Sequence, residues 1–163
     1  FSRPTARVIF SRVAVIAPHN GVPTLMFRAA NKRRNQILEA QLRVYLMRDE
    51  VTTEGQFIRR FHELNLLRNQ TPSFTLSWTA MHPIDELSPL YGMTPESLVS
   101  TKTSIVVSLS GIDETVAQVL HARQTYAAHE ILWNNQFVDI FYHTSDGHRY
   151  IDYNYFHNVV PLE

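Results

Sequence analysis

Three pairs of neighbouring carboxylates come nearest to catalytic chemistry in this sequence, because carboxyl groups act as general acids and bases. They are Asp49 with Glu50, Asp85 with Glu86, and Asp113 with Glu114. Neighbouring side chains on a β-strand point to opposite faces, so such a pair seldom acts on one substrate atom. The spacing therefore does not predict a catalytic dyad. We expect the first pair to be solvated charges in a loop.

Histidine and serine offer two further kinds of chemistry, metal binding and nucleophilic catalysis. The eight histidines show no HExxH spacing, and the chain has no cysteine, so we predict no metal site and expect surface or hydrogen-bonded histidines. Ser88 precedes Pro89 and lies outside any GxSxG motif, which favours a turn residue over a nucleophile. The five glycines form no phosphate loop. We therefore expect no catalytic residue and no required cofactor.

Basic residues form the clearest charged feature of the sequence. They comprise the run Lys32–Arg34, Arg28 nearby, and Arg3 and Arg7 close to the start. Three consecutive basic residues are usually a solvated turn. They bind an anion where several of the side chains converge on one phosphate. The sequence leaves both interpretations open.

The composition indicates one domain without a strong overall charge. A chain of 163 residues can bury its own core, and 15 basic against 15 acidic residues give no net positive field for nucleic acid. No segment approaches the roughly 20 consecutive apolar residues of a membrane-spanning helix. Because the chain starts at Phe1 without an initiator Met or a signal-peptide pattern, we interpret it as a fragment or a processed product.

Strand-type alternation dominates the sequence and determines where its charged residues must lie. In residues 38–46 the apolar side chains fall on one face and Glu39, Gln41, Arg43 and Tyr45 fall on the other, which is typical of a half-buried strand. We expect further strands in the segments 8–16, 24–28, 57–66, 73–81, 104–109 and 117–125.

Local turn and cap signals complete the predicted fold. The sequence Ser145-Asp146-Gly147 predicts a hairpin that pairs residues 137–142 with 150–153. Thr94 followed by Pro95 predicts a short helix near residues 95–100. Many short strands separated by turns favour an all-β fold, an antiparallel β-sandwich with one or two short helices.

Several uncommon sequence blocks occur in one order along nearly the whole chain. The longest is HPIDELSPLYG, residues 82–92, and the others are Pro23–Asn31 followed by Glu39-Ala40, Gly111 with Glu114, Ala122–Tyr126, Glu130–Trp133 and Asp152–His157. In these blocks the sequence resembles the cytoplasmic, C-terminal domain of inwardly rectifying potassium channels, particularly their prokaryotic members.

The resemblance implies an immunoglobulin-like sandwich over residues 8–163, preceded by a tether, residues 1–7, that follows an inner pore helix absent from this sequence. It implies a homotetramer, joined to its own transmembrane pore domain on the cytoplasmic side of the bacterial inner membrane. Four domains would extend the path of the permeating potassium ions and couple lipid or ligand binding to the gate. Candidate ligands are phosphoinositide at the membrane-proximal face, magnesium and polyamines.

The resemblance also gives roles to particular residues. The matched pore-lining positions are Glu39, Ser110, Gly111 and Ile112. The basic positions linked to lipid and gating are Arg3, Arg7, Arg33 and Arg123, and the acids linked to assembly are Asp85, Glu86 and Glu114. Residues 110–114 match a loop that narrows the pore, and glycine suits such a loop because a backbone close to the fourfold axis leaves little room for a side chain.

Two departures from the family's animal members change these expectations. Thr5 and Ala6 stand where the animal channels carry consecutive basic residues, so the sign of a phosphoinositide effect does not follow from the resemblance. Ser110 replaces a second pore-facing acid, and Leu66–Gln70 lacks the acidic pair of the corresponding strand. We therefore expect weak rectification.

A second class of function stays open from the sequence. The chain could be a free-standing β-sandwich module that binds an anionic ligand or a partner protein at its basic turn. A channel would require two hydrophobic spans with a TVGYG-like filter upstream of Phe1, and a free-standing module would not.

Overall fold

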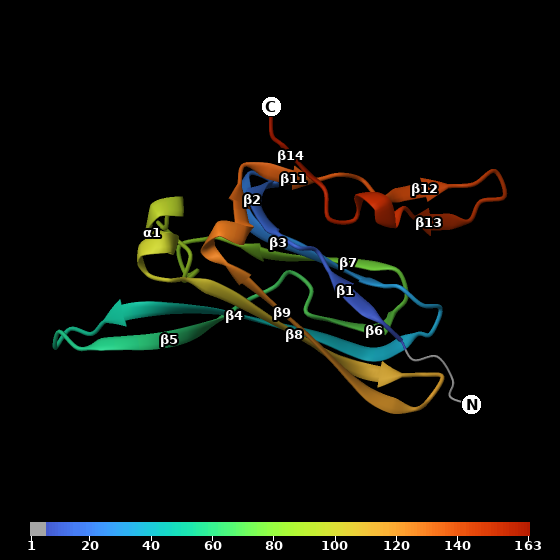
Figure 1. Ribbon diagram of the computed structural model, residues 1–163, viewed down its shortest axis with the longest axis horizontal. Helices are drawn as coiled ribbons and strands as arrows, with labels where there is room; N and C mark the ends of the chain where they lie inside the picture. Colours follow the sequence, from blue (N-terminus) through green and yellow to red (C-terminus); the bar gives the residue numbers. More distant parts are fainter. Residues whose placement is uncertain (1–5) are drawn as a thin grey trace.

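The computed structural model describes residues 6–163, which form two β-sheets stacked on one another (Figure 1). Each sheet has five strands, and the chain has one α-helix among the described residues. The predicted all-β sandwich with a short helix is therefore confirmed. The pairing is antiparallel except between β2 and β10, which run parallel, because residues 128–130 turn the chain into β10 at the far side of β2.

The first sheet is built on β3, which pairs with β1 and β2 along one side and with β7 along the other. Its strands are β1 (Val8–Phe10), β2 (Ala14–His19), β3 (Val22–Asn31), β7 (Ser77–Pro83) and β10 (Ile131–Trp133). The turn between β2 and β3 places Asn20 and Gly21 at positive φ, the conformation that such a tight turn requires.

The second sheet is built on the long strand β4, which pairs with β8 on one side and with β5 and β6 on the other. Its strands are β4 (Ile37–Val51), β5 (Phe57–Leu64), β6 (Gln70–Phe74), β8 (Ser104–Asp113) and β9 (Gln118–Ala127). The hairpin of β4 and β5 extends past the rest of the sandwich (Figure 1).

The C-terminal segment adds two small ladders beside the first sheet. Strand β11 (Asn135–Phe137) pairs with β14 (Val159–Pro161), and β12 (Phe141–His143) pairs with β13 (Arg149–Ile151). The second ladder is the hairpin predicted around Ser145-Asp146-Gly147, although its strands are shorter than expected. The predicted helix is α1 (Pro95–Ser100), and Thr94 caps it by accepting a hydrogen bond from the Ser97 N–H.

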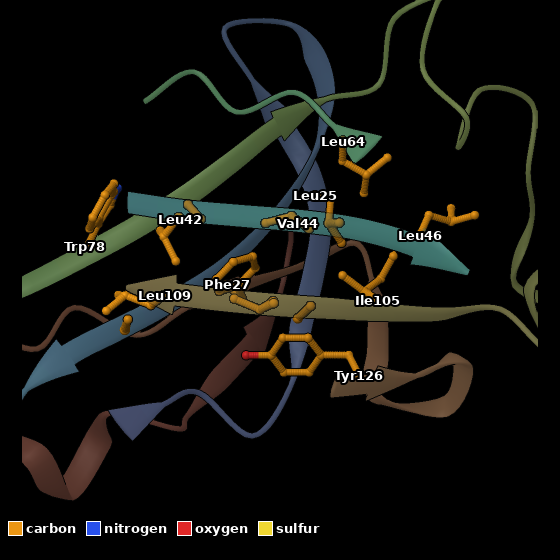
Figure 2. Close-up of a cluster of buried hydrophobic side chains, with 14 of the residues drawn as sticks. Leu25, Phe27, Leu42, Val44, Leu46, Leu64, Trp78, Ile105, Leu109 and Tyr126 are labelled. Carbon is orange, nitrogen blue, oxygen red and sulfur yellow. The ribbon is translucent and has the colours of Figure 1, made fainter. Parts of the chain in front are cut away.

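Alternating apolar side chains from both sheets meet in one core, which Figure 2 shows in close-up. The buried apolar side chains of β8 are Ile105, Val107 and Leu109, and the residues between them are only partly buried. Opposite them lie Leu25 and Phe27 of β3 and Trp78 of β7. Burying side chains of this size stabilises the sandwich by about 2 kcal/mol each, so the sheets form a firm support for the exposed residues.

Candidate functional site

A bulge in β4 gives Glu39 an unusual backbone conformation. The pairing of β4 with β8 shifts between Leu38 and Gln41, and Glu39 lies in the bulge with a φ of 49°. The left-handed region is uncommon for a residue other than glycine, and bulges bend a strand and redirect its side chains. Glu39 is exposed, as predicted. The predicted alternation is wrong before the bulge, because Ile37 is buried and Leu38 is only partly buried.

Gly111 on β8 lies against this bulge and allows the two strands to approach closely. A Cβ atom at Gly111 would lie 2.5 Å from Cγ2 of Ile37 and 3.0 Å from the carbonyl oxygen of Leu38. The space is therefore filled from within the same chain. This contact explains why position 111 needs a glycine. The sequence suggested a different reason, the closeness of the backbone to a fourfold axis.

The four residues matched to pore-lining positions lie together at the bulge. Ser110 pairs with Gln41 and Ile112 pairs with Leu38, so both flank Gly111 on β8 beside Glu39. Residues 110–113 belong to the end of strand β8 and not to a loop, which corrects the expected local structure. Ile112 is exposed and Ser110 is partly buried.

Neutral side chains surround Glu39. A pocket of about 480 Å³ lies at the bulge, and Glu39 is the one ionisable residue in its lining, beside Gln41, Gln70 and Thr71. Gln70 pairs with Gln41 across β6 and β4. The structure thus places a single carboxylate at this surface, with amides where further acids would strengthen its field.

Asp113 and Glu114 follow the bulge and have opposite environments. Asp113 is buried and accepts hydrogen bonds from the backbone N–H groups of Ala6 and Thr115 and from the Asn35 amide. Burial alone would raise the pKa of Asp113, but these bonds to the charged form outweigh it and hold the pKa below its usual range. Glu114 is exposed, so only this acid of the pair remains available to a partner.

The basic run Lys32–Arg34 forms the exposed connection between β3 and β4. Arg7 lies beside it, because the Lys32 N–H donates to the Arg7 carbonyl at 2.8 Å. Ala6 is buried under the same end of the sandwich, so the end of the predicted tether is packed against the domain. Arg3 lies outside the described residues.

Arg28 does not join the basic surface, although its position in the sequence suggested that it could. Its guanidinium donates to the carbonyl oxygens of Val138, Tyr155 and Phe156 at 2.8 to 2.9 Å. Burial lowers the pKa of Arg28 to about 10, against a smaller opposing effect of Asp139, so the group stays charged at neutral pH. The sequence does contain a signal for this buried role, because Arg28 is a charged residue within an otherwise apolar strand.

Arg123 and the acids linked to assembly lie on separate exposed surfaces. Arg123 is on β9, opposite Ser108 of β8. Asp85 and Glu86 are exposed in the turn that follows β7. The Asp85 carboxylate accepts from the Leu87 N–H at 3.0 Å and shapes this turn. The structure therefore does not gather the predicted gating and assembly residues into one site.

His82 and Ser88 support the same turn from inside. The His82 Nδ1 lies 2.6 Å from the Asn65 carbonyl oxygen, so Nδ1 is the donor. The Nε2 atom then accepts from the Ser88 hydroxyl at 2.6 Å, and that hydroxyl accepts from the Leu90 N–H. Burial lowers the pKa of His82. The predictions of a hydrogen-bonded histidine and a turn serine hold here.

The pair Asp49 and Glu50 was expected in a loop, and that expectation is wrong. Both residues lie on β4, where Asp49 pairs with Arg59 at 3.0 Å. Glu50 contacts Arg48 at 2.8 Å and His62 at 2.5 Å. The hydrogen bonds from Arg48 and His62 lower the pKa of Glu50. These acids therefore form ion pairs within β4 and between β4 and β5.

The described residues contain neither a candidate metal site nor a candidate membrane-spanning helix. No three histidine or acidic side chains in residues 6–163 lie close enough together to hold a metal ion. In the same residues no helix has the length and apolar character to cross a membrane.

Comparison with known proteins gives the family. Residues 8–163 match the model of the inward rectifier potassium channel C-terminal domain. The chain is 47% identical over 159 residues to the inward rectifier potassium channel Kirbac3.1 of Paramagnetospirillum magnetotacticum, with 98% of this chain and 54% of that protein covered. It is also 35% identical to the mouse ATP-sensitive inward rectifier potassium channel 12, over 99% of this chain and 39% of that protein.

The chain belongs to the family of inward rectifier potassium channel C-terminal domains. The family is one of ion-channel domains and not a class of enzymes. A third relative, the inward rectifier potassium channel 4 of Mesocricetus auratus, is 36% identical over 168 residues, with 99% of this chain and 38% of that protein covered. The chain thus spans about half the length or less of these curated relatives.

Proposed function

We propose that this chain is the cytoplasmic regulatory and pore-extending part of a prokaryotic inward rectifier channel. Four copies would surround the ion path, each joined to a transmembrane pore domain in the bacterial inner membrane. Potassium ions would permeate along the domain without being held as a cofactor, and the domain would carry out no catalysis. Family membership over residues 8–163 supports this function. The observation that carries it is the cluster of Glu39, Ser110, Gly111 and Ile112 at one bulge, where Glu39 and Ile112 are exposed.

The bulge is suited to a pore wall because it is closely packed and presents one carboxylate. Glu39 has a left-handed backbone conformation, and Gly111 packs against its neighbours Ile37, Leu38 and Ala40 with no space for a side chain. A ring of four such carboxylates would attract cations. The neutral Gln41 and Gln70 add no charge, which favours weak block by magnesium or polyamines over tight block.

The basic surface of Arg7 and Lys32–Arg34 is the proposed contact with anionic lipid. Each basic residue near an anionic membrane surface contributes on the order of 1 kcal/mol. Ala6 connects this surface to the bulge through Asp113, and Asp113 follows Ile112 directly. We propose that lipid binding reaches the ion path by this short route, with Arg33 and Arg123 tuning the response.

The test uses the full-length channel reconstituted in liposomes. Glu39→Gln should weaken block by spermine or magnesium, and the effect should be larger at low than at high ionic strength. Glu63→Gln on β5, another exposed glutamate, is the matched control and should leave block unchanged. If both variants behave as the wild type at low salt, Glu39 does not face the ion path.

Assembly and lipid coupling need separate measurements. Light scattering at high protein concentration should show association toward a tetramer, weakened by the lack of the pore domain that holds the subunits together. A stable twofold dimer that buries the Glu39 surface would contradict the proposal. Arg3→Ala combined with Arg7→Ala should shift the dependence of flux on phosphoinositide by about thirtyfold, and an unchanged dependence would remove these residues from the lipid contact.

A further inference from the structure

A second basic pocket lies on the sandwich, and none of the residues Lys32–Arg34 belongs to its lining. It has a volume of about 220 Å³ and lies between the turn that joins β6 to β7 and the hairpin of β12 and β13. Arg68 lines it from the segment before β6, and Arg149 lines it from the start of β13. The lining contains no aspartate or glutamate. Two positive charges therefore share one small pocket without a negative group in its walls.

Neither arginine has an acidic partner. Among residues 6–163 the ion pairs of arginine involve Arg48, Arg59 and Arg60, all on the β4 and β5 hairpin. Arg68 and Arg149 take part in none of them, and their side chains make no hydrogen bond within the described chain. Like charges gathered in one pocket repel each other, so a bound anion would stabilise them both.

Aromatic rings hold both guanidinium groups in place. The Arg68 guanidinium carbon lies 4.9 Å from the centre of the Trp78 ring, and that of Arg149 lies 4.9 Å from the centre of the Phe141 ring. Stacking uses the face of a guanidinium and leaves its N–H groups free at the edge. Both groups are thus positioned in advance to donate hydrogen bonds.

The rest of the lining supplies further donors. The hydroxyls of Thr75 and Ser77 donate to no described residue and lie in the same lining. The hydroxyls of Ser73 and Thr71 are already used, since Ser73 donates to Gln36 and Thr71 donates to the Ser73 carbonyl. Beneath Arg68, the buried Trp78 Nε1 also has no acceptor. The lining thus offers two arginine side chains and two uncommitted hydroxyls as donors.

The two sides of the pocket are fixed to one another by a small second core. Ala30, Ile140 and Phe156 form it, and Phe141 of β12 and Ile151 of β13 pack against it. Packing of Phe141 anchors the base of the hairpin, and the same ring supports Arg149. Segments far apart in the sequence therefore come together to build this pocket. An arginine that is simply solvated at the surface needs no such arrangement around it.

We propose that this pocket binds a phosphate group. Arg68 and Arg149 would donate charge-assisted hydrogen bonds to its oxygens, and Thr75 or Ser77 would complete the shell, which is the chemistry that arginine pairs provide for tetrahedral oxyanions. The volume lies below the roughly 300 Å³ at which pockets for drug-sized ligands begin. It therefore suits one phosphate, either free or at the end of a lipid headgroup.

The first measurement is a calorimetric titration of the 163-residue chain with sodium phosphate, against sodium chloride of equal ionic strength. Arg68→Gln and Arg149→Gln should each weaken phosphate binding about tenfold, since each removes a charge-assisted bond, and the double variant should not bind. Arg34→Gln removes the same charge from the other basic surface and should bind like the wild type. Because both pocket arginines are exposed, thermal unfolding should show that the variants fold.

The second measurement separates the two sources of phosphate. Vesicles of phosphatidylcholine with and without phosphatidic acid are sedimented with the same four proteins. A requirement for Arg68 and Arg149 on the phosphatidic acid vesicles assigns the pocket to a lipid headgroup, and a requirement only in the phosphate titration assigns it to a free anion. The proposal is overturned if the double variant matches the wild type with both probes, or if neither probe binds. None of these outcomes depends on whether Glu39 faces an ion path.

Discussion

The backbone N–H of Ala6 donates a hydrogen bond to the Asp113 carboxylate, with 2.5 Å between the Ala6 nitrogen and Oδ2 of Asp113. Both residues are buried, so this bond ties the start of the described chain to the end of β8. Asp113 is held in turn by Asn35 from the β3 and β4 connection. A displacement of Ala6 must therefore move the end of β8 or break a buried, charge-assisted bond.

Asp113→Ala should destabilise the domain by about 2 to 3 kcal/mol, because it leaves the buried N–H of Ala6 and its other donors without their charged acceptor. Urea unfolding measures this change. Glu114→Ala removes a neighbouring but exposed acid and should stay within about 0.5 kcal/mol of the wild type. Similar losses in both variants would show that the buried bond has no special weight.

Gly111→Ala should cost about 1 to 3 kcal/mol, because the added methyl group overlaps Cγ2 of Ile37 and crowds the Leu38 carbonyl. Ile37→Ala removes one of these two contacts, so the double variant should lose less than the two single variants together. Chemical denaturation of all four proteins completes this cycle. If the losses of unfolding free energy in the two single variants simply add in the double variant, the added methyl group does not clash with Ile37, because β4 and β8 have moved apart at the bulge.

Glu39→Gly should raise the unfolding free energy by about 1 kcal/mol, because glycine adopts the left-handed conformation without the cost that a side chain incurs. Arg43→Gly, at an exposed position further along β4, should lower it by about 0.5 to 1 kcal/mol, as glycine does in a regular strand. The opposite signs are the test. A loss of stability in both variants would indicate that Glu39 is not strained.

The sequence predicts the sandwich well because its signals are local. Alternation of apolar residues identifies strands such as β8, and Thr94 with Pro95 identifies α1 by the chemistry of a helix start. The bulge at Glu39 could not be predicted in this way, because it depends on how β4 and β8 pair in the folded sheet. The alternation rule consequently misplaced Leu38.

The candidate site was predicted in part for the same reason. Family resemblance singled out Glu39 and Gly111, and the structure brings them together on neighbouring strands. The burial of Asp113 was missed, because a carboxylate beside Glu114 gives no sign of the donors that the fold places around it. Arg28 was placed with the surface cluster because the carbonyl groups it binds come from the far end of the chain.

His82 should make stability depend on pH. Burial lowers its pKa in the folded state despite opposing effects of Asn65 and Asp85, so below its ordinary pKa of about 6.5 the unfolded chain takes up the proton first. The stabilising contribution is complete above that pH and is lost as the pH falls toward the folded-state pKa. His82→Gln should therefore show a flatter dependence of stability between about pH 7.5 and 5.

Urea unfolding of His82→Gln at several pH values also reports the lost hydrogen bonds. At pH 7.5 the variant should be less stable by about 1 to 3 kcal/mol, because the Ser88 hydroxyl and the Asn65 carbonyl lose their partner. His121→Gln replaces an exposed histidine and should keep the slope of the wild type. A wild-type slope in His82→Gln would assign the pH dependence to other groups.

Arg28→Met should loosen the C-terminal segment before it affects the rest of the domain. The methionine fills part of the space, but it leaves the carbonyls of Val138, Tyr155 and Phe156, of which the last is buried, without the donor that now serves all three. Leaving a buried acceptor without its donor costs about 1 to 3 kcal/mol. Arg28→Lys keeps the charge but not the planar fork, so it should recover only part of the loss.

Hydrogen exchange followed by mass spectrometry locates the effect of Arg28→Met. Exchange should accelerate first in residues 138–158, while the core strands β4 and β8 keep their protection, because these strands take their stability from the main core and not from Arg28. Arg12→Met, at an exposed arginine, is the control and should leave the pattern unchanged. Uniform acceleration across the sandwich would mean that Arg28 stabilises the whole fold and that the C-terminal segment does not open separately.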